Sequence, residues 1–175
     1  IIDCTEMEIE NPNSLLLNSQ LYSNYKSRCT VKCLIGVTPH CTVSFVSALF
    51  TGNTSDCDLT RRCGLLDLLE PGDSVMANKG FLISKDLNER GWSMNIPHFN
   101  SSVTRQFTPE EISDNQKIAS VRIHVERAIR RIKSFTFFAS TIPLSCVGTL
   151  PQLWTVAALL SNFRQPLVKK YLNCD

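Results

Sequence analysis

One long amphipathic helix is the feature of this sequence that most constrains its fold. Across residues 116–135, apolar side chains recur at spacings of three, four, four and three, which is the period of one helix face. The residues on this face are Ile118, Val121, Val125, Ile129 and Ile132. Thr108, Pro109 and the two acids after them are typical of a helix start. A helix with one apolar face needs another element to cover that face, so the sequence predicts packed layers.

The element predicted to cover that helix is a β-sheet. Residues 30–38 are β-branched and mostly apolar, and residues 42–51 alternate, so they predict a hairpin turning at Pro39. Residues 4–29 are polar and are expected to be irregular. Further strands are predicted at 1–3, 74–77 and 92–96, and further helices after Ser55, over 84–90 and from about Cys146 or Pro151 to Leu167. This mixture predicts one domain of α/β or α+β class.

Composition excludes several classes of protein. The chain has 175 residues, of which 43% are hydrophobic and 19% charged, with a net charge of +2. These values exclude a disordered chain and a histone-like basic protein. No apolar run reaches the roughly 18 residues of a membrane helix, and the first residues carry no signal-peptide pattern. We interpret the chain as a fragment of a longer protein.

The eight cysteines allow three interpretations. In a small secreted protein they would suggest four disulfides. Because several lie within apolar runs, we favour reduced cysteines that pack in the core of a cytosolic or nuclear protein. A zinc-structured interaction domain is a third possibility. Its support is poor, because Cys29/Cys33 and Cys57/Cys63 lack the C-x₂-C spacing of zinc ligands.

Two carboxylates are candidates for chemistry. Asp3 ends a strand predicted to be buried, where a carboxylate is costly unless it is paired or binds a cation. Glu126 flanks the apolar stripe of the long helix, with Arg122 and Arg130 one turn away on either side. Simpler roles remain open, because Asp3 could cap a turn and Glu126 could form a surface ion pair. If both bind metal, the two carboxylates should lie close together.

The same helix is rich in basic residues. Between residues 116 and 133 it carries Lys117, Arg122, Arg127, Arg130, Arg131 and Lys133, and Glu126 is the acid among them. A solvated helix surface would explain this composition. A contact with the phosphate backbone of nucleic acid would explain it equally well, because clustered Lys and Arg release counterions from nucleic acid.

Several short motifs, taken together and in order, resemble one family. The chain is similar to the DDE superfamily endonuclease domain of PIF/Harbinger-type transposases, a group that includes Harbinger-derived host proteins. The matching segments lie at residues 2–6, 22–26, 30–32, 36–39, 45–47, 52–56, 72–81, 122–127 and 160–163. They include Gly52-Asn53-Thr54-Ser55-Asp56, Asn78-Lys79-Gly80-Phe81 and Arg122-Ile123-His124-Val125-Glu126-Arg127.

This resemblance implies a fold and a chemistry. The implied fold is RNase H-like α/β, with a mixed central sheet that includes an antiparallel hairpin and is flanked by helices. The implied site has three acidic positions, occupied here by Asp3, Asn78 and Glu126, which would hold Mg²⁺ or Mn²⁺. The implied substrate is DNA, in the nucleus or also in the cytoplasm. The N-terminal DNA-binding region of such proteins would lie outside this chain or in a separate partner protein.

Asn78 departs from the family pattern, which has Asp at the second acidic position. A neutral amide removes one negative charge and a bridging carboxylate, so metal affinity should fall. Asp73 lies before the strand and is not expected to substitute, and Asp56 is expected to cap a helix. Two functions remain open at this point. One is a metal-dependent DNA endonuclease or strand transferase impaired by Asn78, and the other is an inactive, host-domesticated module that binds DNA or protein.

Overall fold

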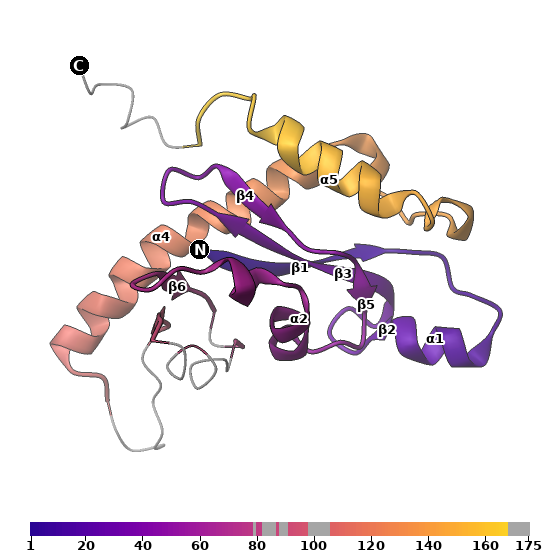
Figure 1. Cartoon of the computed structure of the whole chain (residues 1–175). Helices are drawn as coiled ribbons and strands as arrows, with labels where there is room; N and C mark the ends of the chain where they lie inside the picture. The colour runs from indigo at the N-terminus through magenta and orange to yellow at the C-terminus, as the bar shows by residue number, and fades with distance from the viewer. Residues whose placement is uncertain (79, 82–86, 88–90, 98–105, 168–175) are drawn as a thin grey trace.

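The structure is a computed structural model that describes residues 1–78, 80–81, 87, 91–97 and 106–167. In these residues an antiparallel sheet lies between two groups of helices (Figure 1). Helices α4 (Pro109–Lys133) and α5 (Leu150–Ser161) cover one face, and α2 (Asp56–Arg62) lies against the other. The predicted mixture of helices and strands is therefore confirmed. The predicted helix over residues 84–90 lies almost entirely outside the described residues.

The central strand of the sheet is β3 (Arg28–Val37), which pairs with four other strands. Every one of these ladders is antiparallel. The partners are β1 (Ile2–Glu8), β2 (Tyr22–Ser23), β4 (Val43–Val46) and β5 (Phe50–Thr51). The prediction of a mixed central sheet is wrong for the described strands. Parallel pairing occurs between β6 (Ser74–Met76) and β7 (Ser93–Asn95), and in one isolated bridge from Ile9 to Ile142.

Two predicted strand boundaries are wrong. The strand expected to end at Asp3 continues to Glu8, because residues 4–8 pair with β3. The segment predicted as one strand over 42–51 is split between β4 and β5. At the break, the Ser47 hydroxyl accepts a hydrogen bond from the Leu34 amide at 2.9 Å. A side chain thus takes over a position that the backbone would occupy in a continuous ladder.

The two faces of the sheet carry separate cores. On the side of α4 and α5, alternate residues of β3 such as Cys33 and Ile35 pack with Ile132 and Trp154. On the side of α2, Leu34 packs with Leu59 and Val75, together with the 3₁₀ turn Leu65–Leu68. This division follows from the two-residue period of a strand. The seven described cysteines are free thiols, and two of them, Cys29 and Cys33, are buried in the core beneath α4 and α5.

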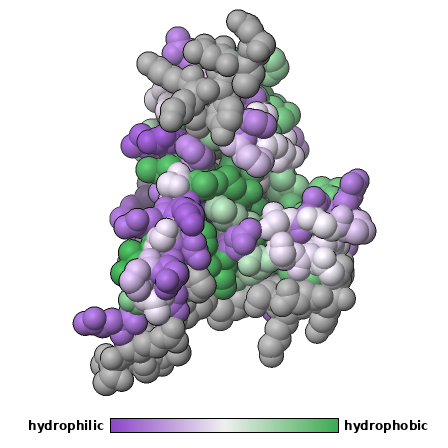
Figure 2. Space-filling model, turned by 90° about the vertical axis from the view of Figure 1, so that its left-hand side faces the viewer, coloured by the Kyte–Doolittle hydropathy of each residue, from purple (hydrophilic) through white to green (hydrophobic). Residues whose placement is uncertain are grey.

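The long helix α4 begins as the sequence predicts, with a capping box between Thr108 and Glu111. Its fully buried residues are Val125, Ala128, Ile129 and Ile132, all in its C-terminal half. The N-terminal half projects past the sheet (Figure 1), which explains why Ile118 and Val121 are only partly buried. Hydrophobic residues consequently reach the surface between polar ones on this side of the molecule (Figure 2).

The segments predicted as irregular or C-terminal also differ in part. Helix α1 (Leu15–Leu21) forms within the stretch expected to be irregular, and its N-cap is Ser14. The last helix, α5, ends at Ser161, earlier than the predicted Leu167. Asn162 follows directly and is hydrogen-bonded to β4, so the chain leaves the helix there. None of the helices in the described residues is long and apolar enough to span a bilayer.

Candidate functional site

A cleft of ≈ 450 Å³ lies beside β1. Within the described strands β1 pairs only with β3, so it is an edge strand of the sheet. Seven residues from β1, β3, the turn before β3, α2 and the segment after β6 line it. They are Asp3, Cys4, Glu6, Tyr25, Lys32, Asp56 and Asn78. Two of the predicted site residues, Asp3 and Asn78, therefore share one cleft despite their separation in sequence.

Asp3 is held on β1 opposite Ile35, on the face that α4 covers. Its Oδ1 accepts a hydrogen bond from the Cys4 amide at 3.0 Å. Burial raises the pKa of Asp3 to about 6, against the opposing effects of this hydrogen bond and of the Arg122 charge. The negative charges of Glu126 and Asp56 raise the pKa of Asp3 further. Asp3 is thus a desolvated carboxylate within electrostatic range of two other carboxylates.

Glu126 projects from α4 and does not line this cleft. Its side chain is 54% exposed, whereas that of Arg122 is 16% exposed. Arg122 Nη2 donates to Glu126 Oε1 at 3.4 Å, one helical turn apart. Glu126 therefore acts on Asp3 through its charge, while Arg122 offsets that charge. The surface ion pair that the sequence allowed for Glu126 is therefore present, with Arg122 as the partner. Asp3 and Glu126 interact through their charges but do not line the same cleft.

Asn78 is positioned by the small parallel sheet. Strand β6 ends at Met76, and the Ala77 amide donates at 3.2 Å to the carbonyl of Asn95, the last residue of β7. The carbonyl of Asn78 accepts from the Phe81 amide at 3.1 Å, which turns the chain back toward the core. Phe81 is almost fully buried and anchors this turn. The segment 76–81 thus presents Asn78 at the cleft after a short strand, as the sequence predicts.

Asp56 belongs to this cleft, and the predicted capping role was wrong. Ser55 is the N-cap of α2, and its hydroxyl accepts from the Asp58 amide at 3.1 Å. Asp56 instead binds Lys32, whose Nζ lies 3.2 Å from Asp56 Oδ1. Asp73 lies elsewhere, in an exposed turn where its carboxylate accepts from the Glu70 amide at 2.8 Å.

Lys32 is a cation inside the cleft that sequence reasoning did not identify. Its Nζ also lies 3.5 Å from Glu6 Oε1 and donates to the Thr54 carbonyl at 2.9 Å. Burial lowers the pKa of Lys32, but Asp56 and Glu6 outweigh that effect and the net pKa is raised. The alternation of polar and apolar residues over 5–8 is a sequence signal for a strand there, and the register of β1 against β3 places Glu6 opposite Lys32.

A pair of divalent ions would need several oxygen ligands gathered around them. Carboxylate and amide oxygens are suitable ligands for Mg²⁺ or Mn²⁺. Within the described residues, however, no three Asp, Glu, His or Cys side chains gather around a common point. Two of the nearby carboxylates are also already paired, Asp56 with Lys32 and Glu126 with Arg122. The residues present therefore do not fit a preformed site for two metal ions.

The six basic residues of α4 do not form one surface. Lys117 pairs with Asp114 at 3.1 Å in the N-terminal half of the helix. Arg122 turns toward Glu126, and Lys133 Nζ donates to the Glu6 carbonyl of β1 at 2.6 Å. Arg127, Arg130 and Arg131 lie together on another side, next to the residues that follow α5.

Comparison with known protein families gives one match. The family is described as DDE superfamily endonuclease, and it matches residues 2–162. Comparisons with curated proteins and with solved structures gave no match. The family match includes Asp3, Asp56, Asn78 and Glu126. Because it covers most of the chain, the protein belongs to the DDE superfamily endonuclease family.

Proposed function

We propose that this chain is a transposase-derived DNA-processing domain of PIF/Harbinger type, in which metal-dependent cleavage is impaired. In this proposal residues 1–175 form one RNase H-like domain that acts on DNA in the nucleus, or also in the cytoplasm. A DNA-binding region outside this chain, or a separate DNA-binding partner, directs it to its target. The membership in the endonuclease family supports the nuclease origin.

One observation carries the proposal of impairment. Asn78 shares the cleft with Asp3, at the position where the PIF/Harbinger pattern has an acid. A neutral amide contributes no charge, and Lys32 and Arg122 already offset the neighbouring carboxylates Asp56 and Glu126. We therefore expect Asp3, Asn78 and Glu126 to hold Mg²⁺ or Mn²⁺ only weakly. Cleavage or strand transfer should be correspondingly slow.

The same observation favours a second candidate function, a module that binds DNA or protein without cleaving it. Lys32 and Arg122 supply positive charge inside the protein that would otherwise come from a bound cation. Lys32 takes the place of a metal ion beside two of the cleft's carboxylates, Glu6 and Asp56, so these two need no metal as a partner. The impaired endonuclease and the non-cleaving module predict different results when residue 78 is made a carboxylate. The endonuclease should then bind metal measurably, and the non-cleaving module should not.

The deciding experiment restores the missing acid with Asn78→Asp. The added carboxylate increases attraction for a divalent cation in a partly desolvated cleft, where charges interact more strongly than in water. Mn²⁺ binding is measured by calorimetry, and nicking is measured on supercoiled plasmid DNA. Asn13→Asp adds the same charge at an exposed turn and serves as the matched control. We expect Mn²⁺ to bind Asn78→Asp at least tenfold more tightly than it binds the parent or Asn13→Asp.

The outcomes separate the two functions. Tighter Mn²⁺ binding that disappears in the double variant Asp3→Asn/Asn78→Asp supports a residual metal site in the cleft, and gain of nicking supports the endonuclease. Equal Mn²⁺ binding by Asn78→Asp and Asn13→Asp would contradict the endonuclease proposal. The non-cleaving binding module would then be the better description.

A further inference from the structure

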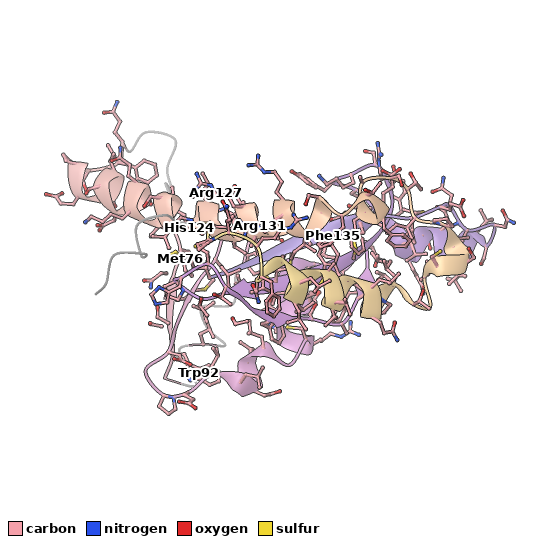
Figure 3. The ribbon with its side chains drawn as sticks, turned by 90° about the horizontal axis from the view of Figure 1, so that it is seen from above. Met76, Trp92, His124, Arg127, Arg131 and Phe135 are labelled. Carbon is pink, nitrogen blue, oxygen red and sulfur yellow. The ribbon has the colours of Figure 1, made fainter. Side chains whose placement is uncertain are left out.

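Four arginines gather on the side of α4 that faces the end of α5. We call Arg127, Arg130, Arg131 and Arg164 the arginine cluster. Together with Ser134 and Leu167 they line a shallow surface pocket of ≈ 530 Å³. Figure 3 shows Arg127 and Arg131 following one another along α4, with Phe135 just beyond the end of the helix. Arg164 reaches the same pocket from beyond the end of α5, so two separate parts of the chain build the cluster.

Two of these guanidinium groups are held in place. Arg164 stacks on Phe135, with its guanidinium carbon 4.9 Å from the ring centroid. Its Nη1 also donates to the Ser134 hydroxyl at 2.8 Å, and that hydroxyl donates to the Arg131 carbonyl at 2.7 Å. Arg131 Nη1 donates to the Ser161 carbonyl at 3.5 Å. The cluster is therefore partly ordered before any ligand binds, which reduces the entropy cost of binding.

In the described ranges, the pocket that the arginine cluster lines holds positive charge without a paired acid, although Glu126 lies beside Arg127 and Arg130 on the adjoining surface. No acidic residue lines this pocket among the described residues. Arg127 and Arg130 make no hydrogen bond or ion pair in the part of the chain that the structure describes. The nearest acid along the helix, Glu126, is hydrogen-bonded to Arg122 instead. Four like charges held together repel one another, so an anionic ligand with several charges would relieve this repulsion.

We propose that the arginine cluster binds the phosphodiester backbone of nucleic acid, at a surface separate from the Asp3–Asn78 cleft. Arginine is suited to phosphate because its planar fork makes paired hydrogen bonds. A duplex offers closely spaced phosphates, matching several guanidinium groups from two elements. This inference rests on the proposed function for its ligand, DNA. Compared with the basic residues of α4 predicted from the sequence to contact nucleic acid, the proposed surface includes Arg164 as well. It leaves out Arg122, whose side chain contacts Glu126, and Lys133, whose side chain contacts β1.

The test compares two triple variants that lose the same charge. Arg127→Gln/Arg130→Gln/Arg164→Gln removes most of the cluster but keeps Arg131, which is bonded to the Ser161 carbonyl. Arg28→Gln/Arg61→Gln/Arg62→Gln is the matched control, at exposed arginines outside the cluster. Binding to a labelled 30-base-pair duplex is measured by fluorescence anisotropy from 50 to 200 mM salt. Circular dichroism and thermal midpoints verify that both variants are folded.

We expect the cluster variant to bind the duplex on the order of tenfold more weakly at 50 mM salt than the control. The slope of log affinity against log salt should fall by about two to three, close to one for each lost phosphate contact. Equal affinity and slope in the two variants, with DNA binding by the parent intact, would overturn the inference and leave the proposed function standing. A parent that binds no duplex would overturn both.

A second ligand separates nucleic acid from an acidic protein partner. A poly-glutamate peptide presents carboxylates in place of phosphates and is measured under the same conditions. We expect the cluster variant to lose more affinity for the duplex than for the peptide. A loss confined to the peptide would overturn the assignment to nucleic acid and identify the cluster as a surface for an acidic protein segment.

Discussion

At the scale of single residues, Asp3 links the stability of the fold to pH. Its pKa in the folded protein, about 6, lies above the ordinary value of 3.8, so the folded state binds more protons between these values. The stability contributed by this residue is therefore fully present below about pH 4 and is lost as the pH rises through 6. Asp3→Asn should remove that loss, because the amide oxygen still accepts from the Cys4 amide.

We expect Asp3→Asn to be more stable than the parent at pH 8 by on the order of 2–3 kcal/mol, with the difference shrinking toward pH 4. Urea unfolding in metal-free buffer between pH 4 and 8 measures this difference. Asp114→Asn, at an exposed carboxylate of α4, gives the effect of losing one surface charge. A constant difference between parent and Asp3→Asn across this range would show that burial of Asp3 carries no such cost.

Gly52 is a second residue with a specific physical role. A Cβ at this position would lie 2.3 Å from Thr30 Oγ1 and 2.4 Å from the Leu21 carbonyl oxygen, closer than any real contact. Gly52→Ala must therefore push β5 away from β3 and α1, and we expect a loss of roughly 1–3 kcal/mol in unfolding free energy. Gly148→Ala, where a Cβ would meet nothing within 4 Å, is the matched control. Similar urea midpoints for the two variants would refute this explanation.

At the scale of elements, Asn162 connects the end of α5 to β4. Its Oδ1 accepts from the Val43 amide at 2.8 Å, and its Nδ2 donates to the Val43 carbonyl at 3.0 Å. The side-chain amide thus satisfies both backbone groups of a buried strand residue, as a neighbouring strand would. Asn162→Ala leaves these groups without their partner, and each such group typically costs about 1–3 kcal/mol.

We therefore expect Asn162→Ala to lower the free energy of unfolding by at least about 1 kcal/mol. Chemical denaturation measures it, with Asn162→Asp as a comparison that keeps the acceptor but loses the donor. The Asp variant should fall between the parent and the Ala variant. Stability of Asn162→Ala equal to that of the parent would mean that water replaces the side chain at no cost.

Much of the fold could be predicted from local patterns, and the failures share a cause. The long helix, its cap, the hairpin around Pro39 and the short strand before Asn78 depend on nearby residues, and they are present. The extension of β1 was missed, although Thr5 and Met7 alternate with Glu6 and Glu8 in a two-residue period. The strand was obscured by its polar residues, which are paired across the sheet with Lys32 and Arg28.

The site was less predictable because it depends on contacts between distant segments. The role of Asp56 follows from Lys32, which lies on a strand packed beneath α2. Arg164 joins the arginine cluster because α5 runs back alongside α4. The residues after α5 therefore lie near the end of α4, where Arg164 packs on Phe135. No periodicity or spacing in the sequence encodes either contact. The positions suggested by family resemblance, Asp3 and Asn78, do line one cleft.

At the scale of the whole molecule, α4 is one helix in two environments. Its 25 residues are continuous, but the buried ones begin only at Val125. Residues 109–120 project past the sheet and are stabilised mainly by local interactions. The capping box contributes about 0.5–2 kcal/mol, and the Lys117–Asp114 pair at most about 0.5 kcal/mol. A helical segment of this length is marginal in water without tertiary packing.

Hydrogen exchange should therefore divide α4 into two parts. Amides of residues 113–120 should exchange through local opening that costs about 0–2 kcal/mol, because little tertiary packing is lost when this half unwinds. Amides of residues 125–133 should be protected up to the global unfolding free energy, since Val125, Ala128 and Ile132 are buried against the sheet. Thr108→Ala, which removes the cap, should accelerate exchange in the first segment and leave the second unchanged. Uniform protection along the helix would contradict this division, because it would show that the projecting half is stabilised as strongly as the packed half.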